Sequence, residues 1–306
     1  FFFKQKTAYE IPKRDWSSDV CSSDLAEAAD AGIVVPILIG PAARMTNAAK
    51  DAGVDIAAFR VIDVPHSHAA AAEAVARVRA GEAALLMKGS LHTDELMGAV
   101  VSSDTGLRTE RRISHAYVMD VPGYPRPLII TDAAINIEPT LEDKADIARN
   151  AIDLAHVIRI EQPRVAILAA VETVNPKMRT TLDAAALCKM ADRGQIKGAL
   201  LDGPLALDNA ISEAAVREKS IVSPVAGRAD ILLVPDLEAG NMLAKQLTFL
   251  GGADAAGVVL GARVPIILTS RADSVRTRLA SCALAVLLAR AATKAAPGVA
   301  GQRRDG

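Results

Sequence analysis

The chain has 306 residues, with 35 Lys and Arg against 36 Asp and Glu, so its formal net charge is −1. A balance this close to zero argues against a protein that binds nucleic acid or a membrane surface through its charge. No uninterrupted apolar run reaches the roughly 20 residues that a membrane-spanning helix needs. The three cysteines show neither disulfide-framework nor metal-knuckle spacing, which favours a reducing, cytoplasmic setting.

The first 25 residues differ from the rest because they have no usable apolar period. Asp15–Leu25 (DWSSDVCSSDL) resembles a translated sequencing-adapter primer. A signal peptide is excluded, since the stretch lacks an apolar core of the required length and carries acidic residues throughout. We therefore expect residues 1–25 to be an artefactual, disordered leader. Because a helix tail at 26–32 precedes any strand, we also expect the first strand of the fold to be missing.

From residue 26 onward, short apolar runs alternate with helical patterns. The runs that predict strands are 34–39, 60–64, 83–87, 114–120, 128–131, 165–169, 198–201, 231–234, 258–260 and 265–268. The patterns that predict helices are 42–52, 69–80, a helix capped by Thr93, 140–158, one ending near 193, 212–218, 242–250 and 275–290. Such alternation is typical of an α/β fold in which helices wrap a parallel or mixed sheet.

One strand-end turn carries the best single candidate site. The strand at 265–268 runs into Thr269, Ser270 and Arg271, and a helix begins behind Asp273. A strand, a short polar turn and a helix N-terminus can form an anion-binding crevice. Arg271 can bind a phosphate through two hydrogen bonds, and Ser270 can donate another. The alternative is a turn whose Ser caps the helix and whose Arg is solvated.

A second strand-end turn has a similar composition. Lys88, Ser90, His92 and Thr93 follow the strand at 83–87, with a glycine among them that lets backbone approach a ligand. The spacing is not that of a P-loop, so this turn alone is a weak signal.

Three further strand ends carry polar side chains. Asp132 and Asn136 follow the strand at 128–131, and an acid there must be hydrogen-bonded or functional. A cap of a helix or loop is an equally good interpretation. Asp202 and Asn241 lie in similar strand-end loops.

The remaining polar clusters are interpreted as structural. Arg108, Arg111 and Arg112 form a basic group that fits a solvated face, and His66-x-His68 lacks the third ligand that a metal site needs. His115 and His156 are interpreted as packed or surface residues. Cys188 and Cys282 are interpreted as core.

Five blocks of the sequence, in this order, resemble the phosphate acetyl/butyryltransferase family. They are Met87–Gly98 (MKGSLHTDELMG), Ile130–Pro139 (ITDAAINIEP), Leu201–Ser212 (LDGPLALDNAIS), Val234–Asn241 (VPDLEAGN) and Ile266–Asp273 (IILTSRAD). The similarity extends over Ala26–Ala289. The first block is closest to the form found fused behind an enoyl-CoA hydratase-like domain, which raises the hypothesis of an upstream domain.

The resemblance implies a fold of two interleaved α/β domains with an interdomain cleft, similar to isocitrate and isopropylmalate dehydrogenases. Domain I would comprise 26–113 and 258–306, and domain II would comprise 114–257. It further implies a homodimer that transfers an acyl group reversibly: acyl-CoA and phosphate give acyl phosphate and CoA through a ternary complex. No metal or nucleotide cofactor is implied, and CoA is a substrate. Acetyl and butyryl both remain open as the acyl group.

The resemblance also implies roles for particular residues. Ser270 and Arg271 match a Ser-Arg pair in the cleft, where the Arg neutralises phosphate and the Ser hydrogen-bonds the thiol or a developing oxyanion. Arg108 is the best match to a second phosphate-binding Arg. The acetyl enzymes carry a basic Asp where this chain has Thr277, so Asp273 is the substitute candidate for the general base, with a helix cap as its alternative role. A thiol of pKa near 8.5 needs little more than a positive site to ionise.

The predicted catalytic residues are therefore Ser270, Arg271 and Asp273. The predicted substrate-binding residues are Lys88, Ser90, His92, Thr93, Arg108, Asp132, Asn136, Asp202 and Asn241. Two other functions remain as alternatives. One is a metal-dependent dehydrogenase of the same architecture, which would need clustered acids and a nucleotide-binding loop. The other is a non-catalytic CoA- or acyl-binding module, which a missing base would favour.

Overall fold

A computed structural model describes residues 6–10, 19–89, 91–268 and 273–295. The strands are β1 (Lys6–Glu10), β2 (Val35–Gly40), β3 (Arg60–Asp63), β4 (Leu85–Met87), β5 (Ser114–Asp120), β6 (Leu128–Thr131), β7 (Arg164–Leu168), β8 (Leu200–Leu205), β9 (Ile231–Leu233), β10 (Asp254–Leu260) and β11 (Ile266–Ile267). The helices are α1 (Asp19–Asp30), α2 (Ala42–Asp51), α3 (Ser67–Arg79), α4 (Thr93–Val101), α5 (Leu141–Val157), α6 (Arg179–Asp192), α7 (Leu207–Ile211), α8 (Glu213–Glu218), α9 (Leu237–Phe249) and α10 (Val275–Ala295).

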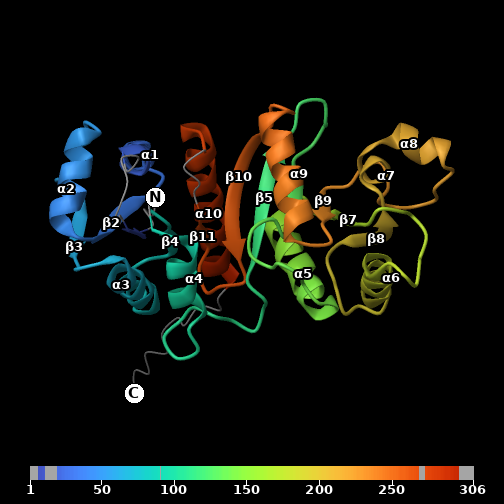
Figure 1. Cartoon of the computed structure of the whole chain (residues 1–306), viewed down its shortest axis with the longest axis horizontal. Helices are drawn as coiled ribbons and strands as arrows, with labels where there is room; N and C mark the ends of the chain where they lie inside the picture. The colour runs from blue at the N-terminus through green and yellow to red at the C-terminus, as the bar shows by residue number, and fades with distance from the viewer. Residues whose placement is uncertain (1–5, 11–18, 90, 269–272, 296–306) are drawn as a thin grey trace, which may run out of the picture.

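The strands of the described residues form one mixed sheet in the order β3-β2-β1-β4-β11-β10-β5-β6-β9-β7-β8. In Figure 1 the labelled strands follow one another from β3 at the left end to β8 at the right end. Five strands from β3 to β11 are parallel, and β6, β9, β7 and β8 are parallel to one another. Antiparallel pairing of β10 with both β11 and β5, and of β5 with β6, joins the two groups. The predicted α/β class with a mixed sheet is confirmed.

Helices cover both faces of the sheet. On one face, α1, α2 and α10 bury apolar side chains against β2, β4 and β11, and α5 and α6 do so against β5, β7 and β9. The other face carries two separate clusters. One joins α3 and α4 to β2, β4 and β11, and the other joins α7 and α9 to β6, β7 and β9. The middle of that second face therefore lies between two cores.

Within the expected disordered leader, the structure describes residues 6–10 as a strand and residues 19–25 as part of a helix. Strand β1 pairs with β2 and β4, with Lys6 opposite Val35 and Thr7 opposite Leu85. Leu25 is 1% exposed on α1, within the core formed with α2 and α10. The physical reason is that parallel β2 and β4 each present unpaired backbone groups, and a strand between them satisfies both. The adapter-like origin of the segment stays a prediction.

Two strand-end loops also differ from the prediction. Asp202 lies inside β8 rather than after it, because β8 is the outermost strand, where a proline such as Pro204 is tolerated. Helix α9 begins at Leu237, so Asn241 is helical. Asp236 caps this helix by accepting a hydrogen bond from the Ala239 backbone N–H at 2.8 Å.

Helix α10 is the longest, with 21 residues, and it packs Cys282, Ala285 and Val286 into the core below β4 and β11. Charged residues interrupt its apolar positions. Of the helices in the described part of the chain, none combines the length and the apolar character that a bilayer crossing requires.

Candidate active site

Two aromatic side chains occupy the middle of the sheet face that lies between the two cores. Along β5, His115 and Tyr117 project from the same face, since residues two apart in a strand share a face. Their rings meet edge to face with centroids 4.5 Å apart. His115 is 1% exposed, whereas Tyr117 is partly exposed. A polar aromatic pair therefore lies where both apolar clusters end.

A carboxylate acts on each ring from a different strand-end loop. Burial lowers the pKa of His115 to about 4, and the Asp132 carboxylate acts in the opposite direction. Burial also raises the pKa of the Tyr117 hydroxyl to about 12, and the Asp273 carboxylate adds to that shift. Both rings are therefore neutral near pH 7. The charges of Asp132, which follows β6, and of Asp273, which follows β11 in the chain, thus act on the two members of the aromatic pair.

The Asp132 loop is held by the carboxylate itself. Its Oδ1 accepts hydrogen bonds from the backbone N–H groups of Ala134 and Ile135, at 2.9 and 3.0 Å. Its Oδ2 accepts from the backbone N–H of Asn136 at 3.2 Å and from Asn136 Nδ2 at 2.5 Å. Asp132 and Asn136 are 2% and 3% exposed. The buried acid is thus satisfied by the loop that it organises.

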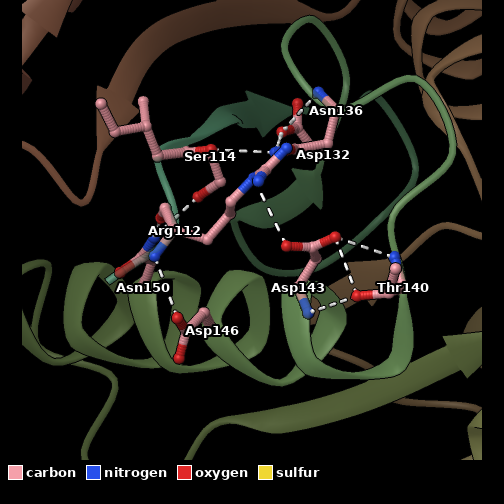
Figure 2. A network of polar contacts seen from close by, with 9 residues as sticks. Arg112, Ser114, Asp132, Asn136, Thr140, Asp143, Asp146 and Asn150 are labelled. Carbon is pink, nitrogen blue, oxygen red and sulfur yellow. Dashed lines mark hydrogen bonds and ion pairs between the residues drawn. The ribbon is translucent and has the colours of Figure 1, made fainter. Parts of the chain in front are cut away.

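Polar groups from α5 extend this network (Figure 2). Arg112 reaches between Asn136 and Asp143, with its Nε 2.7 Å from Asn136 Oδ1 and 3.4 Å from Asp143 Oδ1. Asn150 donates through Nδ2 to the Arg112 carbonyl and to Ser114 Oγ, at 2.8 and 2.9 Å. These contacts fix the start of β5, which carries the aromatic pair.

Helix α9 closes the other side of the Asp132 loop. A Cβ on Gly240 would come within 2.5 Å of the Asp132 carbonyl oxygen, so only glycine lets the helix approach this far. Asn241 Nδ2 donates to the Ala133 carbonyl at 3.1 Å. The structure therefore brings Asp132, Asn136 and Asn241 together.

The Lys88 turn lies at the carboxyl end of β4. Lys88 Nζ donates to the carbonyl oxygens of Gly89 and Leu91, both at 3.1 Å. His92, rather than Thr93, is the N-cap residue of α4, because Thr93 is already helical. The Glu95 carboxylate accepts from the His92 backbone N–H at 3.2 Å. Ser90 lies outside the described residues.

The turn after β11 is described at its two ends. Ser270 and Arg271 lie outside the described residues, between Leu268 and Asp273. Ser274 caps α10, since its Oγ accepts from the Thr277 backbone N–H at 3.1 Å. A capping hydroxyl thus stands directly after Asp273 in the chain. The Thr277 hydroxyl lies 3.0 Å from Ser274 Oγ, within the same capping group.

Arg108 and Asp202 lie apart from the Lys88 turn. Arg108 forms an isolated antiparallel β-bridge with Ala262. This bridge lies beside the amino ends of β11 and β4, whereas the Lys88 turn follows the carboxyl end of β4. Asp202 lies on β8, four strands from β5 in the sheet order, and its Oδ1 accepts from the Gly203 backbone N–H at 2.8 Å. At about 4.8 Å per strand, Asp202 is roughly 19 Å from the aromatic pair.

Sequence reasoning missed His115 and Tyr117 as candidates. Their signal is the alternation in Ser114–Asp120 (SHAYVMD), which places two polar aromatic residues on one face of a strand. Among the described residues, no group of three or more His, Cys, Asp and Glu is arranged to hold a metal ion.

Comparison with known proteins identifies the family. Residues 67–286 match the family model described as "Phosphate acetyl/butaryl transferase". The chain belongs to this family. The matched segment contains the Lys88 turn, the Asp132 loop, the aromatic pair and Asp273.

Individual relatives agree with the family match. A phosphate acetyltransferase of Rhizobium meliloti is 66% identical over 263 residues, which cover 86% of this chain and 83% of that protein. A phosphate butyryltransferase of Clostridium acetobutylicum is 44% identical over 258 residues, covering 84% and 86%. The crystal structure of a branched-chain phosphotransacylase from Enterococcus faecalis V583 superimposes with a TM-score of 0.78 at 30% identity, covering 92% of this chain and 98% of that one.

Proposed function

We propose that this protein is a phosphate acyltransferase that moves an acyl group reversibly between CoA and inorganic phosphate. The observation that carries the proposal is the family match over 67–286, which encloses both strand-end loops and the aromatic pair between them. Acetyl is favoured over butyryl, because identity to the acetyltransferase of Rhizobium meliloti is 66% and to the butyryltransferase of Clostridium acetobutylicum 44%.

The proposed reaction passes through a ternary complex. The CoA thiolate sulfur forms a bond to the carbonyl carbon of the acyl phosphate, and the carbonyl electron pair moves onto oxygen. When that pair returns, the bond from carbon to the phosphate oxygen breaks and phosphate leaves with its electrons. Arg271 would neutralise the phosphate and Ser270 would donate a hydrogen bond, because a guanidinium binds phosphate in a bidentate manner.

Asp273 is the proposed acceptor of the thiol proton. Its charge acts on the Tyr117 hydroxyl, and it comes immediately before the cap residue Ser274 in the chain. Thr277 has no basic group and is engaged with Ser274. In this proposal Asp273 would take the place of the basic Asp that the acetyl enzymes carry at the position of Thr277.

The proposed substrate site is a cleft between two interleaved domains, 26–113 with 258–306 and 114–257, as in isocitrate dehydrogenase. The two separate apolar clusters on one sheet face support this division, since each has its own helices. Lys88, His92 and Thr93 would contribute from one domain, and Asp132, Asn136 and Asn241 from the other. Ser90, Arg108 and Asp202 remain proposed substrate residues on the resemblance alone.

We further propose a cytoplasmic homodimer that needs neither metal nor nucleotide cofactor. Exposed apolar side chains on and just after α9 support a second protein surface there, since Met242, Phe249 and Leu250 are 64%, 67% and 83% exposed. Light scattering on the purified protein tests the dimer.

The activity is tested by mixing acetyl phosphate with CoA in the presence of a chelator and following thioester absorbance. The proposal expects rapid thioester formation without added metal or nucleotide. A dehydrogenase would instead require a divalent ion and reduce a nicotinamide cofactor. A binding module would bind CoA, detectable by calorimetry, without forming thioester, and either of these results would overturn the proposal.

A further inference from the structure

A cavity of about 380 Å³ lies between α5, α10 and the turn that joins β10 to β11, on the sheet face opposite the aromatic pair. Its volume is within the range of roughly 300–1,000 Å³ that small-molecule sites occupy. It lies beside the amino end of β11, whereas the Lys88 turn follows the carboxyl end of the parallel strand β4. No described residue with a proposed role in substrate binding lines it. The cavity therefore lies apart from the proposed substrate residues.

The walls of the cavity are mostly aliphatic. They include Leu154 and Val157 of α5, Leu260, Val264 and Pro265 of the β10–β11 hairpin, and Leu288 of α10. Among the described residues, two charged side chains line the cavity, Asp153 and Arg263, and both are exposed. Asp153 is also paired with Arg111 at 3.5 Å. Because charges of both signs lie at its rim, the cavity has no net attraction for an ionic ligand, and its interior favours an apolar one.

One buried polar side chain, Asn150 of α5, also lines the cavity and is 5% exposed. Its Nδ2 donates to the Arg112 carbonyl and to Ser114 Oγ, at 2.8 and 2.9 Å (Figure 2). Neither acceptor belongs to a residue that lines the cavity. A side-chain amide also has a carbonyl oxygen that accepts hydrogen bonds, and no described group donates to Asn150 Oδ1. That oxygen is the acceptor that Asn150 offers to the cavity.

The turn between β10 and β11 fixes the position of Asn150. Gly261 has a φ of +81°, and a Cβ there would come within 3.0 Å of Asn150 Nδ2. A glycine is needed for both the backbone conformation and the close approach. Thr109 holds the same turn, since its hydroxyl donates to the Gly261 carbonyl at 2.6 Å. The acceptor is therefore in place before a ligand binds, which lowers the entropic cost of binding.

Water alone is a poor occupant for this cavity. A buried water molecule needs about two to four polar partners, whereas the interior presents Asn150 among aliphatic side chains. An aliphatic ligand removes apolar surface from water, and a single donor group on it satisfies the free oxygen.

We propose that the cavity binds a neutral aliphatic molecule whose terminal hydroxyl group donates a hydrogen bond to Asn150 Oδ1. The chain of the ligand lies against the aliphatic walls formed by α5, α10 and the hairpin. Through Asn150, the bound molecule is linked to Ser114 at the start of β5. This site goes beyond the proposed acyl transfer and does not depend on it.

The test uses 1-hexanol and its isomer 1-methoxypentane, which has an ether oxygen in place of the hydroxyl group. Calorimetric titration of the full chain should show saturable hexanol binding with a Kd on the order of 1 mM. The ether cannot donate a hydrogen bond, so its affinity should be about 10-fold lower. Hexanoate and hexylamine should also bind at least about 10-fold more weakly, because each must bring a charge into an aliphatic interior. Absence of saturable hexanol binding, or equal binding of the ether or of either ion, would overturn the proposal.

Two variants of α10 locate the bound hexanol. Ala292 is exposed and lines the cavity, so the ring in Ala292→Phe fills the space without replacing a core residue. Thr293→Phe is the matched control, since Thr293 is also exposed but does not line the cavity. Hexanol affinity should fall at least about 10-fold in Ala292→Phe and stay within about twofold in Thr293→Phe. Circular dichroism checks the fold of both variants. Equal affinities in the two variants would contradict binding in this cavity.

Light scattering tests whether a second copy of the chain covers the cavity instead. We expect Ala292→Phe to have the same molar mass as the unmodified protein. A changed molar mass would make the cavity a contact between subunits and would overturn the proposal. The acyl transfer assay stays independent of this site. A protein that forms thioester without binding hexanol refutes the alcohol site alone, and one that binds hexanol without forming thioester refutes the proposed function alone.

Discussion

Gly257 and Tyr117 are paired directly across the central strands β10 and β5, and the glycine leaves the space in which the tyrosine ring lies. A Cβ at position 257 would also come within 3.2 Å of His115 Nε2. The positions of both aromatic rings therefore depend on the absence of one methyl group. A methyl group added at position 257 would thus displace the His115 and Tyr117 rings.

Gly257→Ala should lower kcat about 10-fold or more, because the added methyl group displaces the Tyr117 and His115 rings by a few tenths of an ångström. Gly98→Ala is the control. Gly98 is exposed on α4 with nothing within 4 Å of its Cβ position, so alanine should stabilise the helix by about 0.5–1 kcal/mol and leave kcat unchanged. Steady-state kinetics and urea unfolding of both variants check this. Equal kcat values for the two variants would contradict the dependence on ring position.

Arg271→Ala should reduce turnover by orders of magnitude, because the phosphate would lose its bidentate cationic partner. Arg276→Ala is the matched control, since Arg276 lies on the first turn of α10 with its side chain 76% exposed and paired to Asp254 at 3.0 Å. That exposed pair contributes little, so turnover should stay within about twofold. Circular dichroism of both variants checks that the fold is kept. Near-normal turnover of Arg271→Ala would remove the Ser-Arg pair from the proposed mechanism.

Asp273→Asn should slow thioester formation from acetyl phosphate and CoA, since the amide cannot accept the thiol proton. The loss should shrink as the pH approaches the thiol pKa near 8.5, where the thiolate forms without a base. Thr277→Val should keep full turnover, because the Thr277 hydroxyl contacts only the cap residue Ser274 among the described residues. A pH profile of kcat for each variant measures this. An Asp273→Asn profile that runs parallel to that of the unmodified protein argues against Asp273 as the base.

Stability should fall between pH 6.5 and pH 4 because of His115. Its folded pKa of about 4 lies below the ordinary value of 6.5, so in this window the unfolded chain binds a proton that the folded protein does not. The free energy of unfolding should therefore drop by up to about 3 kcal/mol as pH falls through the window, with no contribution above pH 6.5. His115→Leu should show a shallower slope in urea unfolding against pH. Identical slopes for the two proteins would show that His115 titrates normally in the folded state.

Much of the fold could be predicted from apolar periodicity. The bounds of β5 and β6 agree with the prediction residue for residue, because each has a compact run of strand-forming residues between turn signals. Errors arose where tertiary contacts override local signals. The helix predicted at 242–250 begins earlier, at Leu237, and it includes Gly240, which lets α9 come close to the Asp132 carbonyl. Strand β1 could not be foreseen, because its stability comes from pairing on both sides.

The candidate site was predictable only as separate strand ends. Asp132 and Asn136 were identified from position, and the structure adds that the acid holds its own loop. His115 was interpreted as a packed or surface residue, and its 1% exposure shows that it is packed. Its contact with Tyr117, and the pairing of Tyr117 with Gly257, depend on the register of β5 with β10. Register between strands more than 130 residues apart is not encoded in local patterns.

The most direct test of the account is the transfer of an acetyl group from acetyl-CoA to ³²P-labelled phosphate by the unmodified protein. The account predicts labelled acetyl phosphate in an amount equal to the CoA thiol released. Release of thiol without labelled acetyl phosphate would be hydrolysis, and it would contradict acyl transfer to phosphate.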